Sequence, residues 1–184
     1  MHALNLIIFA MINGGATQSS ALDAFVVFFT TYVAYGMLVL VAIWVLIWIP
    51  SHKRELHARV RALRHAIEFV FITIATYAIV QTIKIITVVP RPFVAIPDIN
   101  ALLPYQSGYS FPSMHAALSV AIATIITLHY RRLGVLLYVF AIAVALSRIY
   151  VGVHYPKDVI VGGMLGFAIA GLLHIWFCRF HTDK

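Results

Sequence analysis

The feature that most constrains this chain is a series of apolar runs, several of them long enough to cross a lipid bilayer. Of its 184 residues, 62% are hydrophobic and only 10% are charged, whereas about a quarter of the residues in a soluble domain carry charge. In hydrocarbon every backbone polar group must be bonded within the protein, so such runs form helices. The sequence therefore predicts an all-α integral membrane protein, with a single domain over residues 1–184.

Five runs approach the roughly 20 residues that a helix needs to cross the hydrocarbon core. They lie at about residues 24–49, 66–89, 112–129, 133–151 and 159–177. Residues 1–15 are also apolar but too few to cross, and we expect them to form a short interfacial or partly inserted helix. The predicted fold is a helical bundle of about five transmembrane helices with this short helix at its N-terminus.

The basic residues predict the orientation of the bundle. Those on one side are Lys53, Arg54, Arg59, Arg61, Arg64, Arg131, Arg132, Arg179 and Lys184, and the positive-inside rule makes that side cytoplasmic. A pI of about 9.8 could suggest that the chain binds nucleic acid. The basic residues lie in short segments between apolar runs, which argues against that partner. The segment 51–65 is most simply a solvated amphipathic helix that sets orientation. Lys84, Arg91, Arg148 and Lys157 fall at the opposite end, against the bias, which indicates another purpose for that end.

Three polar groups converge on this opposite end: KIITVVPRP, FPSMH and SRIYVGVHYPKD. Lys84, Arg91 and Arg148 offer cations, and arginine matches phosphate oxygens with a bidentate fork. Pro112 and Ser113 begin a helix, whose first N–H groups favour an anion. His115 and His154 offer a nucleophile and a general acid, and Asp158, four residues after His154, is placed to orient it. The loop over residues 90–111 holds four prolines, so we expect no continuous helix there.

Together these groups resemble the signature of the type 2 phosphatidic acid phosphatase (PAP2) superfamily, which is KxxxxxxRP, then PSGH, then SRxxxxxHxxxD. The first and third motifs match in full and the second matches except at Met114, where the family usually has glycine. The resemblance implies that His154 is the nucleophile, that Asp158 orients it and that His115 protonates the leaving oxygen. It implies that phosphate is bound by four residues, which are Lys84, Arg91, Ser113 and Arg148.

The resemblance implies no metal and no cofactor. The sequence agrees, because Asp98 and Asp158 are the carboxylates expected at this end and a two-metal phosphatase needs more ligands.

The stretches PRPFVA and SRIYVGVHYPKDV are similar to short bacterial undecaprenyl-diphosphatases of the bacitracin-resistance type within this superfamily. The likeness implies a lipid diphosphate substrate, undecaprenyl diphosphate, and a site on the outer face of the bacterial plasma membrane. The expected partners are lipid phosphates and membrane lipids. Three alternatives stay open: a phosphatase for phosphatidic acid, phosphatidylglycerol phosphate or lipid A; a lipid phosphotransferase; and a non-catalytic lipid-binding protein.

Several residues outside the motifs have simpler interpretations. Gly162 and Gly166 form a GxxxG pattern that predicts a helix-packing face. His129 and His174 are expected to be packing residues or to lie at cytoplasmic helix ends. Lys157 is expected to be a surface charge, and the single cysteine, Cys178, excludes an internal disulfide.

Overall fold

The computed structural model describes residues 2–51, 56–103 and 106–181, and this part of the chain contains helices and no strand. Lys53, Arg54 and Lys184, three of the residues on which the predicted orientation rests, lie outside the described residues. The helices are α1 (His2–Asn13), α2 (Ser20–Ser51), α3 (Leu56–Thr87), α4 (Pro92–Ala95), α5 (Met114–His129), α6 (Arg131–Tyr150) and α7 (Pro156–His181). The predicted all-α fold is confirmed.

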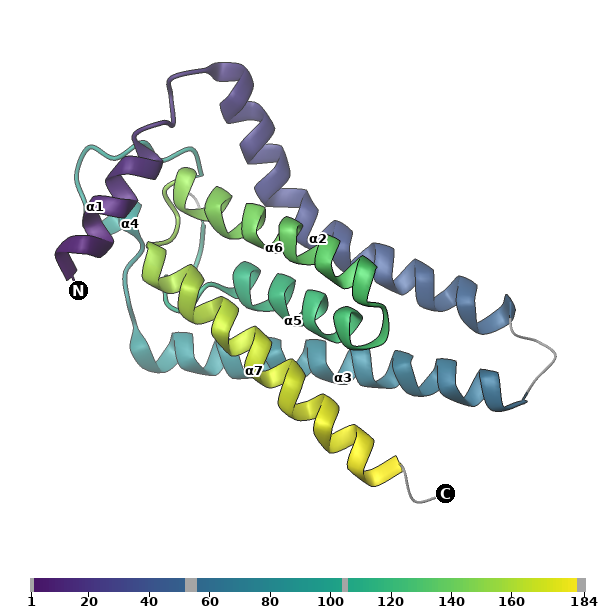
Figure 1. Cartoon of the computed structure of the whole chain (residues 1–184). Coiled ribbons are helices and arrows are strands. Elements are labelled where there is room, and N and C mark those ends of the chain that lie inside the picture. Colours follow the sequence, from purple (N-terminus) through teal and green to yellow (C-terminus); the bar gives the residue numbers. More distant parts are fainter. Residues whose placement is uncertain (1, 52–55, 104–105, 182–184) are drawn as a thin grey trace.

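Helices α2, α3, α5, α6 and α7 form an elongated bundle with α5 at its centre (Figure 1). The central helix packs against the other four. Its buried side chains include several alanines, Ala116, Ala117, Ala121 and Ala123, and such small residues let neighbouring helix backbones approach closely. With 16 residues, α5 is only about 24 Å long, which is shorter than a hydrocarbon core. Because other helices surround it, α5 does not have to span lipid alone.

Three stretches of the described residues are long and apolar enough to cross a membrane: Ala62–Ala95, which takes in most of α3 and the separate turn α4, Arg131–Tyr150 and Pro156–Arg179. They correspond to the second, fourth and fifth predicted runs. Helix α3 begins at Leu56, ten residues before the predicted run at 66. Part of the basic segment 51–65 is therefore helical and continuous with the span. Large apolar side chains such as Ile86 and Leu172 are exposed on the bundle surface, as expected for contact with lipid.

The short helix α1 packs against α6 and α7, at the end of the bundle where the proline-containing loop lies (Figure 1). The Phe9 and Tyr155 ring centroids are 5.7 Å apart. The Asn13 side-chain amide donates to the carbonyl oxygens of Asn100 and Tyr150, both at 2.8 Å. Helix α1 is thus fastened to the loop and to the end of α6.

The loop after α3 also contains one helical turn, α4, which the four prolines did not lead us to expect. Pro92 occupies the first position of this turn, where the missing N–H costs no hydrogen bond. The expectation that no continuous helix runs through this loop otherwise holds for its described residues.

Candidate active site

All seven residues that the sequence predicted for the site lie at one end of the bundle, where α3 and α6 end and α5 and α7 begin. Together with one further residue, Ser110, they form what we call the basic cluster. Its members are Lys84 in α3, Arg91 before α4, Ser110 in the loop, Ser113 and His115 at the start of α5, Arg148 in α6, His154 between α6 and α7, and Asp158 in α7. All except the partly buried His115 are buried, and the exposed fraction of Arg148 is 2%.

Close packing of α7 on α5 fixes one wall of the basic cluster. A Cβ atom at Gly162 would lie 2.5 Å from the Ser113 carbonyl oxygen, and one at Gly166 would overlap the Ala117 carbonyl oxygen. The predicted helix-packing face is confirmed. The approach allows the Ser113 N–H to donate to the Asp158 carbonyl oxygen at 2.9 Å. It therefore places the N-terminus of α5 beside the first turn of α7.

Ser113 is the N-cap of α5, and its hydroxyl accepts a hydrogen bond from the Ala116 N–H. The first N–H groups of an α-helix have no partner within the helix, and together with the helix dipole they favour an anion. The start of α5 therefore adds backbone donors to the cations of the basic cluster. The side chain of Met114 does not remove them, since methionine keeps its N–H.

Lys84 and Arg91 hold the loop in place through its backbone carbonyls. The Lys84 ammonium donates to Tyr109 at 2.6 Å and to Ser110 at 3.2 Å. The Arg91 guanidinium donates to the carbonyl oxygens of Ser107, Gly108 and Val153, at 3.0–3.1 Å. These two cations thus shape the loop as well as supplying positive charge.

Arg148 approaches the basic cluster from the last turn of α6. Its Nη1 donates to the Thr30 hydroxyl of α2 at 3.1 Å, so helix α2 also helps to position the cluster. Its carbonyl oxygen accepts hydrogen bonds from the N–H groups of Val153 and His154. These bonds turn the chain sharply after α6 and bring His154 back toward the three cations.

The surroundings of His154 define its protonation. Nε2 lies 3.5 Å from Arg91 Nη1, and a guanidinium can only donate. Nε2 therefore presents its lone pair, and the ring proton resides on Nδ1. Burial, followed by the charges of Arg148, Arg91 and Lys84, holds the pKa of His154 well below its usual range. At neutral pH the cluster therefore contains an uncharged imidazole with an unprotonated Nε2.

Asp158 and His154 interact through Ser110, which the sequence did not predict. Asp158 Oδ2 lies 3.6 Å from His154 Nδ1, beyond a good hydrogen bond. The Ser110 hydroxyl donates to Oδ2 at 2.5 Å, and its oxygen lies 3.3 Å from Nδ1, whose proton it can accept. Asp158 Oδ2 also accepts from the Tyr155 N–H at 2.9 Å, which resembles the reach-back of a capping box. Asp158 therefore builds the turn before α7 and anchors Ser110.

His115 lies close enough to interact electrostatically with Arg148, His154, Arg91 and Lys84. The basic cluster thus combines three cations, one carboxylate and two imidazoles. Its excess of positive charge suits an anion with several oxygens, and arginine and lysine are the residues that bind phosphate. A neutral imidazole among them can act as a nucleophile.

Comparison with known proteins agrees with this chemistry. The undecaprenyl-diphosphatase BcrC of Bacillus subtilis is 35% identical over 176 residues, which cover 95% of this chain and 84% of that protein. The crystal structure of Aquifex aeolicus LpxE superposes with a TM-score of 0.76 and 27% identity, covering 94% of this chain and 95% of that one. The PAP2 type phosphatidylglycerolphosphate phosphatase of Bacillus subtilis shares the fold, with a TM-score of 0.73 at 18% identity over 100% of this chain and 89% of that one. Residues 65–181 match the PAP2 superfamily, and the chain belongs to that superfamily.

Proposed function

We propose that this chain hydrolyses undecaprenyl diphosphate to undecaprenyl phosphate and inorganic phosphate, through a phosphohistidine on His154. Family membership makes the chain an integral-membrane lipid phosphatase, a hydrolase of phosphoric esters. The similarity to an undecaprenyl-diphosphatase over 95% of the chain supports the choice of substrate. The observation that carries the proposal is the buried, uncharged His154, whose Nε2 lone pair faces Arg91 beside two further cations.

In the first step, Nε2 of His154 attacks the terminal phosphorus of the diphosphate. The P–N bond forms as the bond between that phosphorus and the bridging oxygen breaks, and undecaprenyl phosphate departs. The phosphate oxygens are held by the cations Lys84, Arg91 and Arg148. Ser113 and the backbone at the start of α5 hold them as well. Ser110 and Asp158 take up the positive charge that develops on the imidazole, through the hydrogen bond from Nδ1. His115, in its protonated form, donates a proton to the leaving oxygen and becomes neutral.

In the second step, His115 accepts a proton from a water molecule, and that water attacks the phosphohistidine. The P–N bond breaks, inorganic phosphate leaves and His154 returns to its neutral form. A phosphate monoester departs more readily than an alkoxide, so a diphosphate substrate demands less of the acid His115 than a phosphate ester does.

An apolar groove of about 350 Å³ supports a substrate with a long hydrocarbon chain. It lies between α1, α5, α6 and α7, and its lining includes Ile12, Ala116, Ile142, Ile149, Ile160 and Met164. Ala116 and Ile149 directly follow His115 and Arg148 in the sequence, so one end of the groove lies near the basic cluster. We propose that the isoprenoid chain occupies this groove while the diphosphate reaches the cations.

The basic loops predict that the basic cluster faces the extracytoplasmic side of a bacterial plasma membrane. This orientation forms part of the proposal. A cysteine placed at the exposed Lys157, next to the basic cluster, is expected to react in intact cells with a membrane-impermeant maleimide. The native Cys178, at the other end of α7, is expected to be labelled only after the cells are opened.

The decisive experiment is phosphate release by the purified protein in detergent with a chelator present. Undecaprenyl diphosphate and phosphatidic acid are compared side by side, with His154→Ala as the control. The expected result is strong preference for the diphosphate, abolished by the substitution, with 32P trapped on the wild-type protein in acid-labile form after rapid quenching. Equal or faster turnover of phosphatidic acid would instead assign a general lipid phosphatase.

A further inference from the structure

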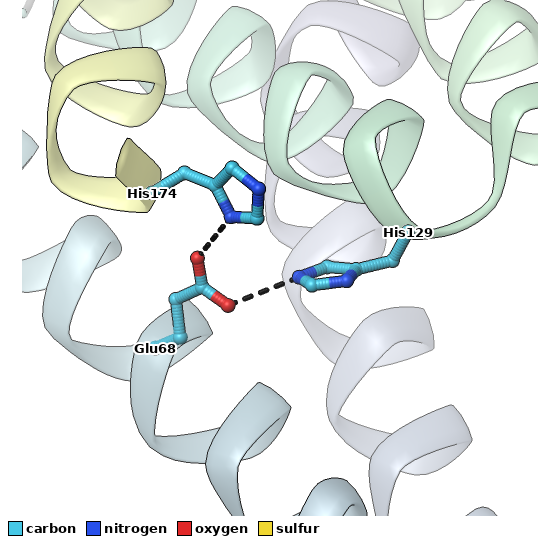
Figure 2. Close-up of side chains that lie close together, drawn as sticks. All are labelled: Glu68, His129 and His174. Carbon is cyan, nitrogen blue, oxygen red and sulfur yellow. Dashed lines mark hydrogen bonds and ion pairs between the residues drawn. The ribbon is translucent and has the colours of Figure 1, made fainter. Parts of the chain in front are cut away.

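A second polar cluster lies in the opposite half of the bundle, away from the basic cluster. Glu68 of α3, which is buried, accepts hydrogen bonds from two histidines on other helices (Figure 2). His129 Nε2, at the end of α5, lies 3.0 Å from Glu68 Oε2, and His174 Nδ1 of α7 lies 2.6 Å from Oε1. We call these three residues the Glu68 cluster. Glu68 and Lys84 are 16 residues apart on α3, which separates the two clusters by about 24 Å along that helix.

The Glu68 cluster has the composition and spacing of a metal site. One imidazole nitrogen from each histidine and one carboxylate oxygen of Glu68 all lie within 4.8 Å of one another. Imidazole and carboxylate bind Zn²⁺ at about 2.0–2.2 Å, and three protein ligands commonly leave a further position for water. An ion between the three side chains would replace the ring protons that now bridge them, with small rotations of the rings. The three side chains come from three different helices, so the ligands converge on one point in the core.

Two further donors flank the cluster on the same helix faces. His65 precedes Glu68 by three residues on α3, and its ring centroid is 4.0 Å from that of His129. Cys178 follows His174 by four residues on α7, and its Sγ lies 3.6 Å from His174 Nε2. Residues three or four apart share one face of a helix. A partner on the outer ring nitrogen fixes the tautomer and orientation of a metal-binding histidine.

A purely hydrogen-bonded cross-link is the simpler explanation of these contacts, and it satisfies both oxygens of Glu68. It does not account for the flanking His65 and Cys178, whose side chains are also metal-binding types and lie against the same two imidazoles. Imidazole, carboxylate and thiol together favour zinc among the common divalent ions, whereas calcium and magnesium prefer oxygen ligands alone.

We propose that Glu68, His129 and His174 bind a divalent transition-metal ion, with Zn²⁺ the best fit. The ion fastens α3, α5 and α7 to one another, and these helices carry Lys84, His115 and Asp158 of the basic cluster at their other ends. Its role is structural, because no part of the hydrolysis passes through this half of the bundle. Chelation is therefore expected to lower the melting temperature of the protein while phosphate release continues at temperatures well below it.

The test is zinc binding by the purified full-length protein. The wild type is stripped with a chelator, incubated with Zn²⁺ and freed of excess ion, and the zinc per chain is measured by elemental analysis. Glu68→Gln and His174→Asn keep side chains that can form hydrogen bonds. His154→Ala is the matched control, because it removes one buried histidine from the other cluster. The proposal expects one zinc per chain in the wild type and in His154→Ala, and affinity at least about 100-fold weaker in the two ligand variants.

Two outcomes would overturn the proposal: a wild type that holds no more zinc than Glu68→Gln, or a His174→Asn protein that binds as tightly as the wild type. Elution as one species with unchanged helical circular dichroism shows that each variant is folded. A second readout uses Co²⁺ in place of Zn²⁺, since bound nitrogen ligands give visible absorption bands. The bands are expected in the wild type and in His154→Ala, and their absence from the wild type would also contradict the site.

Discussion

The basic cluster and the Glu68 cluster share helices α3, α5 and α7, to which the basic cluster adds Arg148 of α6 and residues of the loops, and the two clusters satisfy their polar groups in different ways. In the Glu68 cluster, side chains from α3, α5 and α7 bond directly to one another. In the basic cluster, Lys84 and Arg91 donate mainly to backbone carbonyls of a loop. The basic cluster contains three buried cations and one buried carboxylate, that of Asp158.

The difference shows what each end of the bundle can bind. Buried charge of one sign is costly unless it is paired, so the basic cluster calls for an anion with several oxygens. The Glu68 cluster joins one carboxylate to two imidazoles, a set that suits a proton or a cation. The excess of positive charge favours phosphate chemistry at the basic cluster. The mutual hydrogen bonds of the Glu68 cluster favour a structural cross-link there.

The largest expected effect is at the nucleophile. His154→Ala is expected to lower phosphate release at least about 10⁴-fold, because removing a nucleophile abolishes the covalent path and leaves only binding effects. His154 lies in the turn between α6 and α7 and not within a helix, so the melting temperature is expected to change little. Parallel measurement of initial rate and thermal melting checks both statements. A rate within tenfold of the wild type would contradict the assignment of His154 as the nucleophile. The basic cluster would then no longer differ from the Glu68 cluster by carrying the reaction.

Ser110→Ala tests whether the hydroxyl couples Asp158 to His154. Its loss leaves the buried Nδ1–H and Oδ2 groups less well satisfied, at a cost of about 1–3 kcal/mol, so kcat is expected to fall about tenfold or more. KM is expected to change less, since the Ser110 hydroxyl is bonded to Asp158 and contacts His154 Nδ1. Ser110→Thr keeps the hydroxyl and is expected to recover part of kcat. A substitution that raised only KM would make Ser110 a binding residue instead.

The motifs predicted the basic cluster well because each of them lies where a helix meets the same end of the bundle. Ser110 was not predicted, because the stretch GYSFPS contains several hydroxyl groups and forms no regular secondary structure before α5. For His129 and His174 the sequence predicts packing residues or positions at cytoplasmic helix ends, and it does not bring them to Glu68. Their convergence depends on how α3, α5 and α7 are rotated about their axes, which helix length and hydropathy do not determine. The docking of α1 through Asn13 likewise depends on backbone carbonyls that no side-chain pattern reveals.

Glu68→Gln tests the opposite cluster. It removes the charge that two imidazoles contact, and we expect a loss of about 2–3 kcal/mol in the free energy of unfolding, or about 5–10 °C in melting temperature. The initial rate is expected to fall far less than in His154→Ala. The matched control is Asp98→Asn, which neutralises an exposed carboxylate and should not shift the melting temperature. A variant that melted like the wild type would show that the Glu68 cluster contributes nothing to the fold.

The pH dependence of His154 follows from its surroundings. Because burial and the three cations lower its pKa, the neutral, nucleophilic imidazole persists as the pH falls through the usual range of histidine, about 6–7, and is lost only well below it. The measurement is NMR of the protein with 13C-labelled histidine, with the resonance assigned by its absence from His154→Ala. Titration with a midpoint near pH 6.5 would mean that the cations do not act on this ring.

The smallest effect is expected at Met114, the position where the PAP2 motif usually has glycine. Met114→Gly keeps the backbone N–H at the start of α5. If backbone groups bind the phosphate, kcat/KM is therefore expected to stay within about threefold, well under the tenfold that 1.4 kcal/mol would give. Glycine at the first position of α5 costs about 0.5–1 kcal/mol of helix stability, so the melting temperature is expected to fall by about 2 °C. Met114→Leu, which keeps the bulk, is the control and is expected to match the wild type in both measurements. A gain of more than tenfold in kcat/KM for the glycine variant alone would show that the methionine side chain holds the substrate away from the backbone. In that case side chains as well as backbone would shape the basic cluster, and the contrast with the Glu68 cluster would rest on charge alone.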